Sequence, residues 1–329
     1  MQFSRRSLLA TTGLGVLALG ACSSPDVPSG TGGEAPGAKG FPVTVATKFG
    51  DVVIEQPPTR VVALGWGDAE VALALGVQPV GASDWLAFGG EGVGPWSAGR
   101  YTNPPTLIAT LEPDFEAIAA LQPDLILDVK SSGDQERYDR LSDLAPTVGV
   151  PVDGDSYLVS THQQTTMISQ ALGKPAEGQA LLDKLDKAFT AAAEAHPEWK
   201  GRTVSAVTRT AETWGAYIQG SERVQFLERL GFTQNPKIAE LPVNEGGFSV
   251  TLSTEQLRRI DADLIIAFPI YVETTKISED PLFTAVPAVA DGRAVVMDGD
   301  LSQAYSLATV ESQLFALDRL IPQLEKALP

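Results

Sequence analysis

One twelve-residue pattern occurs twice in this chain and constrains its fold more than any other feature. Residues 116–127 read EAIAALQPDLIL, and residues 255–266 read EQLRRIDADLII. In both copies a Glu opens a run with helically spaced apolar residues, and Asp-Leu-Ile follows at the same offset. The short apolar segment after the Asp is typical of a strand buried on both faces of a parallel sheet. Each copy therefore predicts a helix that leads into a buried strand, the αβ half of a βαβ unit.

The two copies also begin alike. Asp114 and Ser253 stand two residues before Glu116 and Glu255, where a side-chain oxygen can cap a helix. Each Glu then falls in the first helical turn, where the helix dipole favours an anion. One interpretation is that these are ordinary carboxylates on two unrelated amphipathic helices. The other is a duplicated lobe that presents a Glu at the same place twice.

A second match favours the duplicated lobe. In the first half, a buried strand over 60–64 is followed by a turn and a helix over 69–75 that stops at a Gly. In the second half, we expect a strand over 203–207, a loop over 208–215 and a helix over 222–230 that again stops at a Gly. Two matching features in the same order indicate an internal repeat.

The segment between the two halves, residues 174–199, is rich in Ala, Leu, Lys and Glu, and predicts one long helix. Lobes joined by a single packed helix hinge only slightly. Residues 41–55 predict an antiparallel edge hairpin with its turn at 49–51, and residues 304–328 predict a single final helix. The expected fold class is α/β, with two Rossmann-like lobes of mainly parallel sheets joined by one long α-helix. The expected boundaries are an N-terminal lobe over 41–173, a linker over 174–200 and a C-terminal lobe over 201–329.

The first 40 residues are predicted to lie outside the fold. Residues 1–21 combine Arg5 and Arg6 with a short apolar run, which indicates a twin-arginine signal peptide. The stretch that ends at Cys22 resembles the lipobox of bacterial lipoproteins, in which the Cys is acylated. Residues 22–40 are rich in Ser, Gly and Pro and predict a flexible tether. We therefore expect a protein held at the extracytoplasmic face of the cell membrane by a lipid anchor only.

Charge and motifs exclude several functions. The chain has 24 Lys and Arg against 41 Asp and Glu, and loss of Arg5 and Arg6 with the signal leaves 22 against 41, a net charge of −19. Such a chain is not expected to bind nucleic acid. It has no Walker loop, no G-x-S-x-G motif and only two His, His162 and His196, without ligand-spaced partners. We expect no enzyme, no cofactor and no protein-held metal, so any metal would arrive already chelated.

Aromatic and basic side chains gather in the loops that follow the predicted strands. In open parallel sheets, ligands bind at the carboxyl ends of the strands. A cleft there with aromatic rings and Arg suits a large, partly apolar anion, although Trp85 also suits a core position. We favour Arg100 and Arg209 as the cations over Lys130 and Arg223, which are equally compatible with a solvated surface. The candidate ligand-binding residues are Trp66, Trp85, Trp96, Arg100, Tyr101, Arg209, Trp214, Tyr217, Phe248, Tyr271 and Tyr305.

Three segments carry a family resemblance. RVVALGWGDAEVALALGVQPVGASDW (60–85), EPDFEAIAALQPDLIL (112–127) and TLSTEQLRRIDADLII (251–266) resemble the substrate-binding lipoproteins of ABC importers for ferric siderophores. DWLAFGG (84–90) and LSQAYSLA (301–308) resemble the actinobacterial siderophore branch. The resemblance spans about residues 41–325 and implies a monomer that captures an Fe(III)-siderophore between its lobes. It also implies that Glu116 and Glu255 pair with Arg residues of the two ABC permease subunits.

Two other hypotheses stay open. Haem- and cobalamin-binding proteins share this architecture, and such a ligand would want an axial residue such as His162, Tyr271 or Tyr305. A cell-envelope hydrolase or scaffold is the third hypothesis, which the missing nucleophile and base disfavour.

Overall fold

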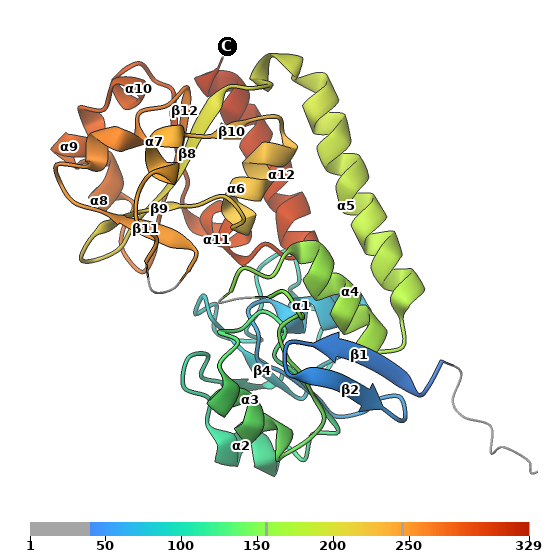
Figure 1. Ribbon diagram of the computed structural model, residues 1–329. Coiled ribbons are helices and arrows are strands. Elements are labelled where there is room, and N and C mark those ends of the chain that lie inside the picture. The colour runs from blue at the N-terminus through green and yellow to red at the C-terminus, as the bar shows by residue number, and fades with distance from the viewer. Residues whose placement is uncertain (1–39, 155–156, 245–246, 329) are drawn as a thin grey trace, which may run out of the picture. The chain divides into compact units, whose positions relative to one another are not determined.

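Five parallel strands form the N-terminal sheet (Figure 1), in the order β5-β4-β3-β6-β7. The computed structural model describes residues 40–154, 157–244 and 247–328. The strands are β3 (Val61–Ala63), β4 (Gly81–Ser83), β5 (Thr106–Ile108), β6 (Leu125–Leu127) and β7 (Thr147–Val148). The central strand β3 and its neighbour β6 are buried along their whole length, as the sequence predicted.

Helices cover both faces of this sheet. They are α1 (Asp68–Ala74), α2 (Phe115–Ala120), α3 (Gln135–Ser142) and α4 (Thr161–Ala171). Val61 and Ala63 of β3 pack with α1 and α4, whereas Val62 packs with α2 and α3. Strand alternation therefore gives each face of the sheet its own core.

The predicted hairpin is present, but in a different setting. β1 (Val43–Thr47) and β2 (Gly50–Ile54) pair antiparallel in a two-stranded sheet of their own, not at the edge of a larger one. Thr47 pairs with Gly50, so Lys48 and Phe49 form the turn, slightly earlier than expected. Val45, Val52 and Ile54 bury the hairpin against the core that α1 and α4 share.

The C-terminal sheet has six strands in the order β11-β9-β8-β12-β13, with β10 also paired to β8. They are β8 (Thr203–Arg209), β9 (Trp214–Tyr217), β10 (Thr233–Gln234), β11 (Ser249–Leu252), β12 (Leu264–Pro269) and β13 (Ala294–Val296). The loop predicted over 208–215 was wrong in part. β8 continues to Arg209, and a turn closed by the Thr210–Thr213 backbone hydrogen bond returns the chain as β9.

This hairpin is where the second lobe departs from the first. In the N-terminal sheet β4 alone flanks β3 on one side. In the C-terminal sheet that side of β8 is shared, because β10 pairs with its first residues and β9 with its last. The remaining order, with β12 beside β8 and then β13, matches β3-β6-β7. The repeat is thus preserved on one half of each sheet.

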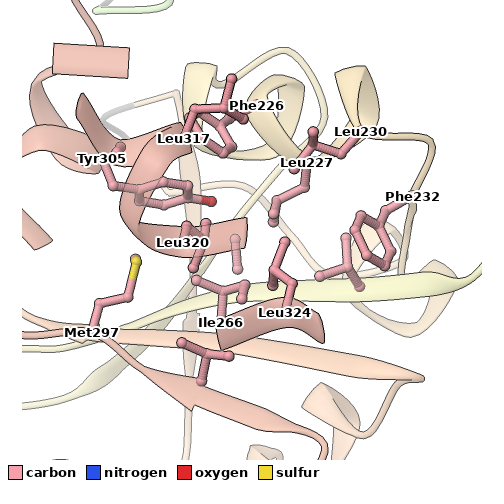
Figure 2. Close-up of a cluster of buried hydrophobic side chains, with 14 of the residues drawn as sticks. Phe226, Leu227, Leu230, Phe232, Ile266, Met297, Tyr305, Leu317, Leu320 and Leu324 are labelled. Atoms are coloured by element: carbon pink, nitrogen blue, oxygen red, sulfur yellow. The ribbon is translucent and has the colours of Figure 1, made fainter. Parts of the chain in front are cut away.

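Short helices and α6 (Glu222–Arg229) cover the C-terminal sheet. One face carries α7 (Pro236–Ala239), α8 (Thr275–Ser278), α9 (Pro281–Thr284) and α10 (Pro287–Ala290). The other face carries the largest core of the described residues (Figure 2). On that face, α6 and β12 pack against the last helix of the chain. The residues in contact include Phe226, Leu227, Leu230, Phe232, Ile266, Leu317, Leu320 and Leu324.

The predicted inter-lobe helix is α5 (Pro175–Ala195), followed by a 3-10 turn over Pro197–Trp199. Leu182, Leu185 and Phe189 form its buried stripe. Gly178 allows α5 to lie close to α4, since a Cβ there would stand 2.3 Å from the Ser169 hydroxyl oxygen. α5 therefore packs against the rest of the protein and is not a solvent-exposed linker.

The single final helix that the sequence predicted is instead two helices, α11 (Gly299–Leu307) and α12 (Val310–Ala327). Ala308 adopts a left-handed conformation with φ of 57°, and Thr309 caps α12 through a capping box with Ser312. A Thr with a Ser three residues later was the signal for this break. None of the described helices is both long and apolar enough to cross a membrane.

The repeated Glu-to-DLI unit takes two forms. In the first copy Asp114 caps α2 by accepting from the Glu116 and Ala117 amides, as predicted. The second copy is a turn followed by a 3-10 helix, Leu257–Ile260, not the predicted α-helix. Apolar residues three positions apart are compatible with either kind of helix, so the spacing did not distinguish them.

The Asp of each copy accepts the same pair of hydrogen bonds from a Thr in its lobe. Asp124 accepts from the Thr59 amide at 2.8 Å and hydroxyl at 2.7 Å, just before β3. Asp263 accepts from the Thr203 amide at 2.7 Å and hydroxyl at 2.8 Å, at the start of β8. The repeated Asp thus fastens the first strand of each lobe to the strand that follows the Asp.

Candidate ligand-binding site

Three aromatic rings of the N-terminal lobe form a stack. Trp66 lies between Trp85 and Tyr157, with both ring-centroid distances at 3.9 Å and with tilts of 11° and 20°. The three residues follow β3, β4 and β7, so they all stand beyond the carboxyl ends of strands in one parallel sheet. This is where ligands bind in such sheets.

The C-terminal lobe meets this stack with further rings. Phe248 lies edge-on, 6.5 Å from Trp66 and 6.3 Å from Tyr157, and Tyr217 stacks on Phe248. The Arg223 guanidinium stands 4.6 Å from the Tyr217 ring and 5.6 Å from the Trp85 ring. We call Trp66, Trp85, Tyr157, Tyr217, Phe248 and Arg223 the interlobe cluster. Rings from both lobes thus surround one cation.

Lys130 is a second buried cation of this region. It follows β6, is 3% exposed, and its backbone oxygen accepts from the Trp66 amide at 2.9 Å. The pKa of Lys130 is lowered to about 8, mainly by burial and also by the nearby charge of Arg223, while Glu222 and Asp68 act in the opposite direction. The two cations come from different lobes and sense each other's charge.

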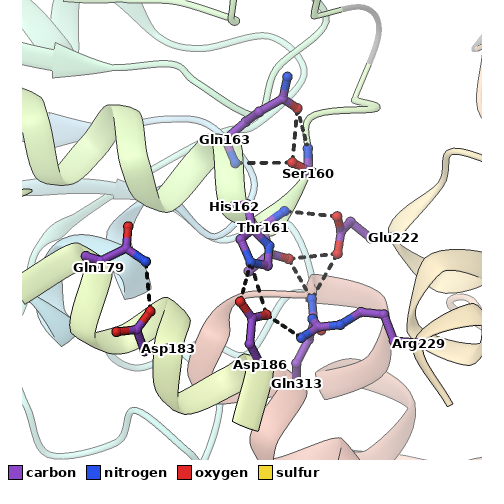
Figure 3. Close-up of polar contacts among 10 residues, drawn as sticks. All are labelled: Ser160, Thr161, His162, Gln163, Gln179, Asp183, Asp186, Glu222, Arg229 and Gln313. Carbon is purple, nitrogen blue, oxygen red and sulfur yellow. Dashed lines mark hydrogen bonds and ion pairs between the residues drawn. The ribbon is translucent and has the colours of Figure 1, made fainter. Parts of the chain in front are cut away.

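Two carboxylates lie near these cations. Asp68 accepts from the Val129 amide at 2.8 Å and from Gln164 at 2.6 Å, and burial raises the pKa of Asp68 to about 6. Glu222, in the first turn of α6, accepts from the Thr161 amide at 2.9 Å and from Gln313 at 2.9 Å (Figure 3). Both carboxylates therefore already have hydrogen-bond donors.

Glu70 of α1 fixes the loop that carries Trp96. It accepts from the Gly94 amide at 2.9 Å, from Trp96 Nε1 at 2.6 Å and from the Thr309 hydroxyl at 3.0 Å. Burial raises the pKa of Glu70 to about 7, against hydrogen bonds that lower it. Because Thr309 caps α12, this one carboxylate ties an N-terminal loop to a helix of the other lobe.

A cavity of about 240 Å³ adjoins the interlobe cluster. Tyr271, which is 70% exposed, donates from its hydroxyl to the Trp85 backbone oxygen at 2.6 Å, and Ser306 accepts from Arg223 at 2.8 Å. The cavity brings the segments 84–90 and 301–308 together. Its lining residues are Leu86, Pro269, Ile270, Tyr271, Gly299, Ser302, Gln303 and Ser306.

The structure does not bring Arg209 and Trp214 to this cluster. Both lie on the face of the C-terminal sheet that α7 to α10 cover. Trp214 stacks on Phe283 at 5.2 Å and donates to Asp280 at 3.0 Å. The cation at the cluster is Arg223, from a helix, and not Arg209, from a strand.

Four other predicted residues lie apart from the stack. Trp96 packs against Phe315 of α12, and Arg100 forms an ion pair with Glu311 at 3.5 Å. Tyr101 is buried in a small core of the N-terminal lobe. Tyr305 is buried in the large C-terminal core, where its hydroxyl donates to the Arg223 backbone oxygen. Tyr305 therefore supports Arg223 from the core, whereas Tyr101 belongs to a separate core.

The sequence prediction did not include Tyr157, and it ranked Lys130 and Arg223, which the structure places at the cluster or beside it, below Arg100 and Arg209. Tyr157 follows β7, so the rule on strand ends would have selected it had that two-residue strand been recognised. Arg223 stands in the first turn of a helix whose start is buried, which the sequence did not reveal. A Lys directly beyond a buried strand was the available signal for Lys130.

The two docking candidates are exposed, and each has a cavity beside it. Glu116 lies in the first turn of α2, next to a cavity of about 340 Å³ that Leu111 and Phe115 help to line. Glu255 lies in the turn before Leu257, next to a cavity of about 250 Å³ that Leu257 and Leu282 help to line. The repeat thus presents a Glu beside a hollow on each lobe.

Residues proposed for an axial haem ligand are not gathered together. His162 lies 3.1 Å from Asp186 of α5, Tyr305 is buried in the core, and Tyr271 is exposed. Across the described ranges, no group of three or more His, Cys, Asp or Glu is arranged to hold a metal ion.

Two sheets joined by a packed helix, with rings and cations of both lobes gathered between them, define a two-lobed substrate-binding protein. The chain belongs to the periplasmic binding protein family, whose model matches residues 61–301. It is similar to the probable siderophore-binding lipoprotein YfiY of Bacillus subtilis, with 29% identity over 313 residues, 89% of this chain and 90% of that protein. The family consists of binding proteins, so the chain is not an enzyme.

Solved structures show the same fold. Streptococcus pneumoniae PiaA in complex with ferrichrome aligns with a TM-score of 0.73 and 27% identity, over 87% of this chain and 98% of that one. Staphylococcus aureus SirA complexed with staphyloferrin B aligns with a TM-score of 0.72 and 26% identity, over 86% and 98%. The predicted fold class of two α/β lobes joined by one long helix is therefore confirmed.

Proposed function

We propose that this protein captures a ferric siderophore between its lobes and delivers it to an ABC permease at the extracytoplasmic face of the membrane. The interlobe cluster carries the proposal, because it combines five rings with a buried guanidinium between two lobes. A ferric siderophore is a bulky chelate with an apolar surface and exposed oxygen acceptors. Aromatic faces and N–H donors are the groups that bind such a surface.

Of the residues expected from sequence, we assign Trp66, Trp85, Tyr217, Phe248 and Tyr271 to ligand binding, and we add Tyr157, Lys130 and Arg223. Trp85 is the ring of the stack that the ligand displaces in this proposal. It is only half-buried, and its loop is held to the other lobe by the Tyr271 hydroxyl. Moving Trp85 away would uncover the face of Trp66.

For delivery, we propose that Glu116 and Glu255 each contact a basic residue of one permease subunit. Both carboxylates are exposed and occupy matching positions of the repeat. Exposed ion pairs of this kind contribute about 0.2–1 kcal/mol each. Their role would be to set register and speed encounter more than to supply affinity.

Attachment to the membrane is also part of the proposal. Residues 1–21 would be removed as a signal, Cys22 would be acylated, and residues 22–40 would act as a tether to lobes over 41–173 and 201–329. Residues 1–39, which include Cys22, lie outside the described residues. The relatives include lipoproteins of Bacillus subtilis, which supports this part. We propose a monomer.

Quenching of intrinsic Trp fluorescence tests the ligand class. Trp66 and Trp85 lie in the cluster, so a bound ferric chelate should quench them strongly. The purified chain would be titrated with ferric siderophores, haem and cobalamin. Saturable quenching by a ferric siderophore supports the proposal, whereas saturable binding of haem or cobalamin alone would assign the protein to those ligands.

A further inference from the structure

The interlobe cluster and its surroundings hold more buried hydrogen-bond donors than acceptors. Lys130 Nζ, Arg223 Nε and Trp66 Nε1 are buried and have no acceptor among the described residues. All three are donors only, since an ammonium, a guanidinium and an indole N–H cannot accept. A buried donor without an acceptor costs free energy, most of all when it is charged.

The nearby carboxylates do not meet this need. The oxygens of Asp68 are engaged by Val129 and Gln164, and those of Glu222 by Thr161 and Gln313. These two acids offset the cationic charges at a distance, because both raise the pKa of Lys130. They supply no hydrogen bond to Lys130. Gln164 Oε1 is a buried acceptor that also lacks a partner, but one oxygen cannot satisfy all three donors. The other acceptors must therefore come from a bound molecule or from water.

The two cations also stand on opposite sides of the division between lobes. Lys130 follows β6 of the N-terminal sheet, and Arg223 lies in α6 of the C-terminal lobe. Burial is the main cause of the lowered pKa of Lys130, and the charge of Arg223 acts in the same direction, so each cation disfavours the charge of the other. An anion between them would relieve this repulsion and would bind both lobes at once.

From this surplus of donors we infer that the cargo is an anionic ferric chelate, whose carboxylate or catecholate oxygens accept from Lys130 and Arg223, rather than a neutral hydroxamate chelate. The inference rests on the proposed siderophore function and specifies its substrate class. Two structures similar to this chain carry different classes of ligand, ferrichrome in PiaA and staphyloferrin B in SirA, so the similarity leaves the class open. The unpaired buried donors of this chain favour the anionic ligand.

The first measurement compares ligands by Trp quenching of the full chain at constant ionic strength. The probes are ferric citrate and ferric enterobactin as anions, ferrichrome as a neutral chelate and ferrioxamine B as a cation. We expect an anionic probe to bind at least about tenfold more tightly than ferrichrome and ferrioxamine B. Equal or tighter binding of ferrichrome or ferrioxamine B would overturn the inference and leave the siderophore function standing. Binding of haem or cobalamin alone would instead overturn the function.

The second measurement uses Lys130→Met, which keeps a side chain of similar length and removes its charge. If Lys130 binds an anion and has no partner in the unliganded protein, this variant should resist urea at least as well as the parent, because it lacks the unpaired buried ammonium. It should also bind the best anionic probe about tenfold or more weakly. Arg223→Met should show the same loss of affinity. Lys184→Met, in an exposed position of α5, is the matched control and should change neither property.

A fall in stability of Lys130→Met with unchanged affinity would contradict the inference, since it would make Lys130 a structural residue. Unchanged affinity in both the Lys130 and Arg223 variants would show that water satisfies these donors in the complex. Either result overturns the assignment of an anionic cargo without depending on which probe binds best.

Discussion

Glu70 of the first lobe accepts a hydrogen bond of 3.0 Å from Thr309, the residue that caps α12 in the second lobe. A reciprocal contact exists, because Glu222 of the second lobe accepts from Thr161, the first residue of α4 in the first lobe. α1 and α6 are the first helices of their lobes. Each therefore holds the N-terminus of a helix in the other lobe, where a carboxylate is favourable. These two contacts are among the hydrogen bonds that join the lobes.

Glu70 should make stability depend on pH. Its pKa is raised from 4.5 to about 7, so the folded state binds this proton more tightly than the unfolded state. Ionising Glu70 in the folded state therefore lowers the free energy of unfolding. This loss is absent below pH 4.5, is complete above about pH 7, and is on the order of 3 kcal/mol. Stability should therefore fall as pH rises from 5 to 8, and Glu70→Gln should reduce that fall. Urea unfolding at the two pH values measures it.

The control for Glu70→Gln is Glu91→Gln, on the loop that Glu70 holds through Gly94 and Trp96. Glu91 accepts from the Gly99 amide at 3.1 Å but is more exposed than Glu70. We expect this control to leave the pH profile as it is in the parent. Asp68, whose pKa is also raised, contributes in the same direction and accounts for the fall that remains in Glu70→Gln. A profile unchanged by Glu70→Gln would contradict the assignment.

The repeated Asp residues should stabilise both lobes in the same way. Asp124→Ala and Asp263→Ala each remove two hydrogen bonds to a Thr before or at the first strand, and each should cost about 1–3 kcal/mol. The Thr203 amide lowers the pKa of Asp263, so its contribution is present above the ordinary pKa of 3.8 and is lost as pH falls through the lowered value. Thermal unfolding at neutral pH and near pH 3 tests both statements. A variant as stable as the parent at neutral pH would show that its Asp is dispensable.

The position of each Trp predicts its response to ligand. Trp66→Phe and Trp85→Phe should each remove a large part of the quenching by a bound ferric siderophore, because both rings belong to the stack. Trp214→Phe should leave the fractional quenching nearly unchanged, because this ring packs on Phe283 at the opposite face of the sheet. Titrations of the three variants under identical conditions compare them. A dominant effect of Trp214 would move the site to that face.

Docking should separate from ligand binding. Glu116→Ala combined with Glu255→Ala should abolish uptake of iron by cells and leave the affinity of the purified protein intact, because both residues are exposed and neither belongs to the interlobe cluster. Glu112→Ala, at an exposed acid that lines the cavity beside α2, serves as the control and should retain uptake. Lost affinity in the double variant would refute a role in docking.

Local signals in the sequence predicted much of the fold. Wholly apolar runs located the strands around Ile126 and Ile266, and Asp114 marked the start of α2. The break at Ala308 was not predicted, because one residue in a left-handed conformation leaves the apolar periodicity on both sides nearly intact. The hairpin that forms β9 was missed because β9 is four residues long and pairs with the end of β8, where Thr208 and Arg209 had been assigned to a loop.

The site was harder to predict because sequence gives the alternation of a strand but not which face the ligand meets. Arg209 shares a face of β8 with Val207, and that face is covered by short helices. Arg223 comes from a helix, where burial of the first turn depends on contacts with Tyr217 and with Ser306 of α11. Such contacts between distant segments leave no local pattern in the sequence.

The position of iron in a crystal of the complex tests the central claim most directly. Anomalous diffraction at the iron edge locates the metal of a bound ferric siderophore without relying on side-chain density. We predict a single peak between the two lobes, bordered by Trp66 and Trp85 on one side and by Arg223 on the other. A peak beside Arg209 and Trp214, or on the outer surface of one lobe, would contradict the account.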